Sequence, residues 1–361
     1  MKQLIAIAAA AAIASGTAFA DEKSDKQAFR EAYKAYQAAI AQGDKNQALA
    51  QGKLAFEHGE KIYGPDHKNT ATLLLNYGSL VRDDNEAAKL LKDAVNRYEK
   101  LYGKDAEQLI DPLIELASKS AGFGSLGVAR KHYSRALRLA EKHHPNDPFV
   151  EGQIRLEMGS VALHESRARE ALRHLVRAKE LFSGVDDPAI RHRLAQADFQ
   201  IGKYKMAKKE YEEAETALLS SLDVYEEIAP NAQMTMTNHA FLIRVYEEQG
   251  MRDQATKHCR AIGAKSPTNP DQDYLPVYRS SPIYPASAHR AGKEGYAVIE
   301  LTVDENGFVK DPAVIERKGH SAFETASLEA AQKFRYAPRY ENGEAVATTG
   351  VRYRFTYSIR N

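Results

Sequence analysis

The chain has 361 residues, of which 43% are hydrophobic and 27% charged, and its formal net charge is +1. This length is sufficient for two domains, and the composition is that of an ordinary globular protein. The near-neutral charge gives no field that would select nucleic acid, so we expect no nucleic-acid partner. The single cysteine, Cys259, cannot form an internal disulfide and is predicted to be a buried thiol.

Residues 1–20 have the pattern of a secretory signal peptide. Lys2 gives the positive start, and the apolar stretch from Leu4 to Ala14 is too short to cross a bilayer. Ala18-Phe19-Ala20 then has the small-x-small pattern of a cleavage site. We therefore expect export with cleavage after Ala20, and the alternative is an uncleaved membrane anchor.

Residues 27–265 contain an internal repeat, marked by triplets of mostly small residues spaced i, i+4, i+7. This spacing places each triplet on one face of a helix. The triplets are Ala48, Gly52, Ala55; Ala87, Leu91, Ala94; Ala129, Tyr133, Ala136; Ala171, Leu175, Ala178; Ala214, Leu218, Ser221; and Ala255, Cys259, Ile262. Their first members recur every 39 to 43 residues, so the sequence predicts about six repeat units.

A second set of residues marks the partner helix of each unit. Ala117, Gly159, Gly202 and Ile243 each lie twelve positions before the first member of a triplet. Small residues at both points allow two antiparallel helices to approach closely. The first unit fits least well, because Tyr36 stands at this position.

This pattern resembles the tetratricopeptide repeat, and the long period resembles the kinesin-light-chain-like variety. The resemblance implies an α-helical superhelix whose concave face holds a peptide or another protein. The helical pattern ends in the Pro-rich stretch Ser266 to Asp271, so we predict a linker at 266–273 and a second domain at 274–361.

The second domain is predicted to be a small α+β unit with the order ββαβ. Residues 297–303 alternate apolar and polar side chains as a half-buried strand does, Asn306-Gly307 predicts a hairpin turn, and residues 308–316 form the returning strand. Pro312 predicts an edge position or a bulge in that strand. A helix follows, with a capping box at Ser321 to Glu324, an apolar stripe reaching Phe334, and an end before Pro338. Residues 347–359 form the last strand.

These elements and their marker residues resemble the TonB C-terminal domain. The markers are Tyr284-Pro285, Ala288, Glu294-Gly295, Gly307, Phe323, Ala326, the run Phe334-Arg335-Tyr336-Ala337-Pro338, and Gly343. The resemblance covers about a quarter of the chain and places the protein in the periplasm. It also implies binding to an outer-membrane TonB-dependent receptor, or to a similar envelope protein, by β-augmentation.

The resemblance gives a set of candidate partner-binding residues: Ile283, Tyr284, Pro285, Arg352, Tyr353, Arg354 and Phe355. In β-augmentation a partner segment adds as a strand to an exposed sheet edge, and the last strand is the candidate edge. Arg352 and Arg354 either pair with acidic side chains of the partner or only protect the edge from aggregation. Ile283 stands where the best-known family members carry Gln. Exchange of the last strand between copies leaves a homodimer open.

The sequence departs from the family's energy transducers, which keep a membrane helix with a coupling His and a Pro-rich spacer. The chain has no His before His58 and no such spacer. We therefore favour a periplasmic adaptor that binds proteins. The alternatives are a membrane-anchored divergent energy transducer and a scaffold for envelope assembly.

No catalytic residues, cofactor or metal site are predicted. The run Gly122 to Gly127 matches G-x-G-x-x-G, but a helix is predicted before it instead of the strand that a dinucleotide site needs. His143-His144 lack a convincing third ligand. Arg169, Arg173 and Arg177 form a basic stripe that is predicted to be a solvated helix face, with an acidic partner as the alternative.

Overall fold

The structure, a computed structural model, describes residues 20–145, 147–265 and 274–359. Residues 1–19 of the predicted signal peptide and the predicted linker at 266–273 lie outside the described residues. The chain divides into two compact units, Met1–Val185 and Asp186–Asn361. Among the described helices, none combines the length and the apolar character that a membrane span needs.

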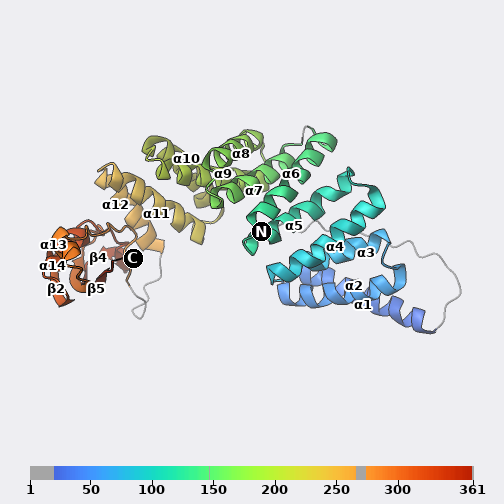
Figure 1. The fold of residues 1–361 in the computed structure, drawn as a ribbon, viewed down its shortest axis with the longest axis horizontal. Helices are drawn as coiled ribbons and strands as arrows, with labels where there is room; N and C mark the ends of the chain where they lie inside the picture. Colours follow the sequence, from blue (N-terminus) through green and yellow to red (C-terminus); the bar gives the residue numbers. More distant parts are fainter. Residues whose placement is uncertain (1–19, 146, 266–273, 360–361) are drawn as a thin grey trace. The chain divides into compact units, whose positions relative to one another are not determined.

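Twelve helices follow one another as six hairpin-like pairs, each first helix packing on the second (Figure 1). The predicted array of α-helical repeats is therefore confirmed. Four pairs lie in the first unit: α1 (Ala20–Gln42) with α2 (Lys45–Tyr63), α3 (Lys68–Leu80) with α4 (Asp84–Tyr102), α5 (Ile110–Gly122) with α6 (Leu126–His143), and α7 (Pro148–His164) with α8 (Ala168–Phe182). Two pairs lie in the second unit: α9 (Pro188–Ala207) with α10 (Tyr211–Ile228), and α11 (Gln233–Glu248) with α12 (Arg252–Lys265).

Aspartates begin several of these helices and glycines end others. Asp44 and Asp187 each accept hydrogen bonds from two backbone N–H groups of the first turn, which would otherwise have no partner. Gly64 and Gly103 end α2 and α4 at φ values of 82° and 86°, which glycine adopts without strain. The repeated sequence Glu-Lys-x-Tyr-Gly is therefore a helix stop.

The predicted triplets are buried along the second helix of every pair. A Cβ atom added at Gly159 would lie 2.6 Å from Leu175 Cγ, and one added at Gly202 would lie 2.6 Å from Leu218 Cγ, so the glycines allow close helix contact. In the first pair the sizes are reversed, because the small residue is Gly52 of α2 and the large one is Tyr36 of α1; a Cβ atom added at Gly52 would lie 3.4 Å from Tyr36 Cδ2. This reversal explains why the first unit fitted the pattern poorly.

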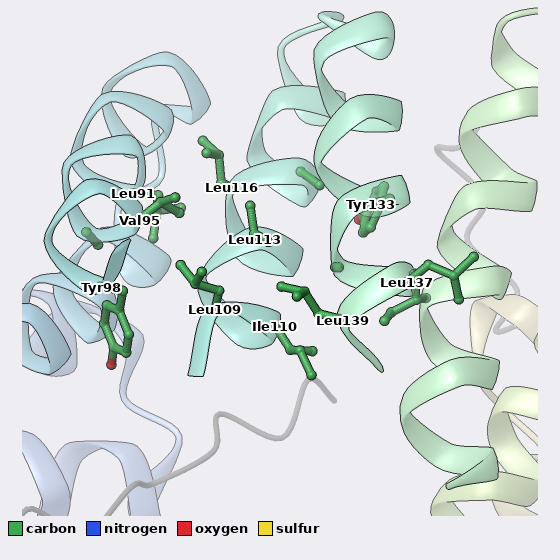
Figure 2. Close-up of a cluster of buried hydrophobic side chains, with 14 of the residues drawn as sticks. Leu91, Val95, Tyr98, Leu109, Ile110, Leu113, Leu116, Tyr133, Leu137 and Leu139 are labelled. Carbon is green, nitrogen blue, oxygen red and sulfur yellow. The ribbon is translucent and has the colours of Figure 1, made fainter. Parts of the chain in front are cut away.

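The largest core of the first unit runs from α3 through α7. Figure 2 shows the middle of this core, where side chains from α4, the short 3-10 helix Glu107–Leu109, α5 and α6 meet. Leu109 and Leu113 are fully buried, as is Leu91 of α4. Each pair therefore buries its apolar face against its neighbours, as stacked repeats do.

The C-terminal domain is a three-stranded antiparallel sheet with helix α14 (Ala322–Ala331) on one face. The strand order is β2-β1-β5, with β1 at Gly295–Val303, β2 at Val309–Lys318 and β5 at Thr348–Tyr357. The predicted ββαβ order is confirmed. The structure adds a short helix, α13 (Ala286–Arg290), and a two-stranded hairpin of β3 (Arg339–Glu341) and β4 (Glu344–Val346).

Strand β2 is irregular at Pro312, where the sequence predicts an edge position or a bulge. Its pairing with β1 shifts register twice. The shift between Val298 and Ile299 leaves Ile315 unpaired, and the shift between Glu300 and Thr302 leaves Asp311 and Pro312 unpaired. Asp311 also has a positive φ of 48°. Both the edge position and the bulge that Pro312 predicted are confirmed.

The two Asn-Gly pairs of the domain make different turns. At the predicted hairpin only Gly307 has a positive φ, and Asp304 accepts hydrogen bonds from the N–H groups of Asn306 and Phe308. At the β3–β4 turn both Asn342 and Gly343 have positive φ values, as a type I′ turn requires. The tight Asn-Gly turn is therefore the second one.

The predicted capping box of α14 is wrong, and so is its predicted end. The imidazole of His320, not Ser321, accepts a hydrogen bond from a first-turn N–H group, that of Ala322, at 3.1 Å. The helix ends at Ala331, and Phe334 reaches the core from the segment that follows. That segment is extended because Arg335 forms β-bridges with Tyr278 and Phe308.

Candidate partner-binding edge

Strand β5 is an outer strand of the sheet and pairs only with β1 among the described residues. From Val351 to Tyr357 it pairs residue by residue with Leu301 to Gly295, without a register shift. Its outer row of backbone N–H and C=O groups therefore forms a regular seven-residue template. The other outer strand, β2, has bulges and a proline, which make it a poorer template.

The predicted arginines lie on the sheet face away from α14 and interact with the domain's own side chains. Arg352 Nε donates to Glu300 Oε2 at 2.8 Å, and the pair is solvent-exposed. The Arg354 guanidinium lies 3.7 Å from the centroid of the Tyr296 ring. An exposed ion pair stabilises by about 0.2–1 kcal/mol, so the Arg352 pair is easily exchanged for another.

Tyr353 and Phe355 point to the opposite face of β5, towards α14. Phe355 is only 4% exposed, and its ring centroid lies 5.4 Å from that of Phe334. Tyr353 packs edge-to-face on Phe334 at 5.0 Å. Both side chains thus belong to the core or its margin, and at these two positions mainly the backbone is available to a partner strand.

The residues of the Tyr-Pro segment also differ in how far they are exposed to solvent. Ile283 is 82% exposed, whereas the Tyr284 ring packs edge-to-face on Tyr357 at 5.6 Å and its hydroxyl donates to the Lys293 carbonyl at 2.6 Å. Pro285 precedes α13 as its N-cap residue. The structure therefore brings Tyr284 to the end of β5 and leaves Ile283 projecting into solvent.

A junction that the sequence analysis missed joins this domain to the last helix pair. Arg335 is 1% exposed, and its Nη1 forms an ion pair with Glu247 of α11. Its Nη2 donates to Thr256 Oγ1 of α12 at 2.7 Å and to the Asn306 carbonyl at 3.0 Å. The guanidinium also lies 3.8 Å from the centroid of the Phe308 ring, so Arg335 is held on several sides.

Close backbone packing completes this junction. A Cβ atom added at Gly263 of α12 would lie 2.2 Å from the Pro338 carbonyl oxygen, and one added at Gly307 would lie 3.5 Å from Cys259 Cβ of α12. Cys259 lies in this contact, where burial raises the pKa of its thiol to about 12. The prediction of a buried thiol is confirmed, and the thiol stays protonated at neutral pH.

A partly buried cluster of polar side chains lies on α10 to α12. His239 Nδ1 and His258 Nδ1 are 2.8 Å apart, and His239 Nε2 lies 2.9 Å from Glu226, which also pairs with Lys265. Burial lowers the pKa of both imidazoles, to about 4 for His258, where the neighbouring His239 and Lys257 add to the effect. One ring must donate to the other, so the geometry requires at least one neutral imidazole.

The other motifs of the sequence lie in the repeats. The run Gly122 to Gly127 joins α5 to α6, and a helix precedes it. Arg169, Arg173 and Arg177 are exposed on α8, as predicted for a solvated face. His143 Nε2 lies 2.7 Å from the Asp105 carbonyl oxygen. Within the described ranges no group of three or more His, Cys, Asp or Glu residues is arranged to hold a metal ion.

Comparison with known proteins assigns the C-terminal domain to a family. Residues 280–359 match the family model of the Gram-negative bacterial TonB protein C-terminal, so this part of the chain is a domain of the TonB C-terminal type. Protein TonB of Pseudomonas aeruginosa is 29% identical over 85 residues, which are 24% of this chain and 25% of that protein. The chain thus matches about a quarter of the length of this curated relative.

The chain is also similar to solved structures at low sequence identity. BtubC (BKLC) from P. vanneervenii is 16% identical, with 72% of this chain and 98% of that chain covered and a TM-score of 0.47. The apo form of RapI is 14% identical, with 67% and 77% covered and a TM-score of 0.49.

Proposed function

We propose that the protein is an exported periplasmic adaptor in which residues 274–361 bind an extended segment of an outer-membrane TonB-dependent receptor or a similar envelope protein. The segment adds to β5 as a further antiparallel or parallel strand, by β-augmentation. The repeats at 27–265 hold a second protein or peptide. The observation that carries this proposal is the regular outer edge of β5 from Val351 to Tyr357, in a domain of the TonB C-terminal type.

Charge supports the same edge. Arg352 and Arg354 lie along β5 on its solvent-exposed face, where a side chain of an added strand would be their neighbour. The Arg352–Glu300 pair is exposed, and exchange of Glu300 for a carboxylate of the partner loses little energy. We therefore expect the bound segment to carry an acidic residue beside Arg352 or Arg354.

Hydrogen exchange of the full-length protein tests this function. The ligands are synthetic peptides that copy the N-terminal periplasmic segments of the TonB-dependent receptors of the same bacterium. Binding should slow exchange of the β5 amides and leave those of β2, the other edge, unchanged. Slower exchange on β2 alone, or no effect of any of these peptides at millimolar concentration, would refute the proposal.

The same edge suits a second copy of the chain, so oligomeric state is measured in parallel. Sedimentation should show that added peptide dissociates any dimer, because peptide and second copy compete for β5. A dimer that is unaffected by a bound peptide would place the dimer contact elsewhere.

A further inference from the structure

A small apolar pocket lies between the first helices of the first two repeat pairs. Its apolar lining consists of Phe29 and Tyr33 of α1, Tyr63 at the end of α2 and Leu73 of α3, and its volume is about 160 Å³. Phe29 and Tyr33 stack with ring centroids 5.8 Å apart, and Tyr63 meets Phe29 edge-on at 5.7 Å. We call it the α1–α3 pocket.

Two cations border this pocket without a compensating anion. Arg30 and Lys34 lie one turn apart on α1, are exposed, and form no ion pair or hydrogen bond between side chains within the described part of the chain. The remaining lining residues are Gln37 and Asn69, so the lining contains no carboxylate. The site thus combines an apolar floor with a positive, amide-bearing rim.

The size of the pocket suits one aromatic ring. Apolar cavities of about 150 Å³ bind benzene, and this pocket has a similar volume and an aromatic wall. The positive rim then requires a negative charge close to the ring. Fixed positive charge beside an apolar pocket selects ligands that carry both features together.

A chain-terminal aromatic residue brings ring and charge together most directly, because both are attached to one Cα atom. In an extended internal segment the residues next to the aromatic one point to the opposite side, so an adjacent acidic side chain turns away from the rim. A terminal α-carboxyl group has a pKa of about 3.3–3.7 and is ionised at neutral pH. The amides of Gln37 and Asn69 can donate to and accept from the peptide groups that precede it.

We propose that the α1–α3 pocket binds the C-terminal residue of a partner protein when that residue is aromatic. The ring lies on Phe29, Tyr33 and Leu73, and the α-carboxylate accepts hydrogen bonds from Arg30 and Lys34. This site is independent of β5, so the protein has two binding sites with different ligand chemistry.

Fluorescence anisotropy with the full-length protein tests the pocket. The probe is a fluorescein-labelled heptapeptide, Gly-Ser-Gly-Ser-Gly-Ser-Phe, with a free C-terminus. We expect binding that weakens at least about tenfold when the C-terminus is amidated or when Ser replaces Phe, because each change removes one of the two recognised groups. A peptide amide with an internal Phe-Glu pair should bind as weakly as the amidated probe.

Variants of the protein locate the site. Lys34→Glu and Arg30→Glu should each weaken binding of the free-acid probe at least about tenfold, and Lys34→Gln should weaken it less. Lys89→Glu, which reverses an exposed charge on α4, is the matched control and should change binding less than twofold. All four residue changes are at exposed positions, and circular dichroism checks that the helices are intact.

Three results would overturn the proposal. Equal binding of the free acid and the amide would show that the terminal carboxylate is not recognised. Equal effects of Lys34→Glu and Lys89→Glu would show that the probe does not bind at this pocket. If N-acetylphenylalanine binds as tightly as the heptapeptide, the ligand is a small aromatic acid and not a protein chain. None of these results bears on peptide binding at β5, which hydrogen exchange reports separately.

Discussion

The ion pair between Arg335 and Glu247 should hold the C-terminal domain on the last helix pair, and Glu247→Ala tests this. The side chains are only 2% and 9% exposed. Removal of one partner from a buried ion pair costs about 3–5 kcal/mol, since it leaves the other charge buried and unpaired. Thr256, Asn306 and Phe308 still contact Arg335, so we expect the lower end, about 3 kcal/mol.

Hydrogen exchange along α12 is the most direct assay, because this helix contacts the domain through Thr256 and Gly263. A loss of about 3 kcal/mol corresponds to an exchange rate roughly a hundredfold faster for amides that exchange by undocking. Glu248→Ala is the matched control. Glu248 is exposed, and with the described residues it makes only long hydrogen bonds, to Tyr278 and Tyr211 at 3.3 and 3.4 Å. Its loss should therefore cost no more than about 1 kcal/mol.

A double variant separates the ion pair from general damage to the contact. Glu247→Leu combined with Arg335→Met removes both charges and keeps apolar volume, so it should be less destabilising than the sum of the two single changes. If Glu247→Ala accelerates exchange no more than Glu248→Ala, or if the two single changes simply add, the ion pair does not hold the junction.

Three further predictions concern the packing and protonation of the helices. Gly159→Ala should lower the free energy of unfolding by about 1–3 kcal/mol, because the added Cβ would lie 2.6 Å from Leu175 Cγ. Gly127→Ala on α6 is the control and should not lower it, because nothing lies within 4 Å of its added Cβ. Urea titration measures both free energies of unfolding, and equal effects of the two changes would contradict close packing at Gly159. The lowered pKa of His258 means that the unfolded chain binds protons more readily, so stability should be full above about pH 6.5 and fall as the pH drops towards 4. The slope of unfolding free energy against pH should flatten in His258→Gln, and an unchanged slope would assign the effect to other groups. Cys259 should not react with a thiol reagent until the protein is denatured, because its pKa is about 12 and it is fully buried; labelling of the native protein at pH 8 would contradict this.

The helix pairs could be predicted because their signal is local and periodic. Small residues recur at one helix face in every unit, and the structure buries each of them. The first pair fits the pattern poorly because its large residue, Tyr36, lies on the first helix and its small residue, Gly52, lies on the second. In several later pairs the small residue is on the first helix, as at Gly159. Periodicity finds which face is buried, but not which helix of a pair carries the small residue.

The strands were predicted with nearly the observed bounds and the β1–β2 turn at its observed place, whereas the conformation of that turn and the capping and end of α14 were not. The sequence identifies residues that tolerate a positive φ, but it does not show which of them adopt one. In the structure only Gly307 has a positive φ in the first turn, whereas both Asn342 and Gly343 have one in the second. The end of α14 depends on Arg335, which pairs with the backbone of Tyr278 and so extends the segment after Ala331. Such a contact has no local signal.

The junction was missed for the same reason. Arg335 stands in the run that marks the domain family, and nothing near it in the sequence indicates a partner. Glu247 lies 88 positions earlier, in a helix that reads as an ordinary repeat element. Only the fold brings the two residues together. The nearby Gly263 allows the close approach of Pro338, but its sequence context does not indicate this contact.

The junction and the candidate edge use different parts of the same domain. The last helix pair contacts the domain at Gly307, at the segment from Arg335 to Pro338 and at the β3–β4 hairpin. None of these residues belongs to β5, whose outer edge from Val351 to Tyr357 pairs with no other strand in the part that the structure describes. A strand added to β5 would therefore join the sheet without displacing Arg335, whose contacts with Glu247 of α11 and Thr256 of α12 hold the domain on the last helix pair. This arrangement suits the proposed adaptor, because binding at β5 would leave the contacts of the domain with α11 and α12 intact.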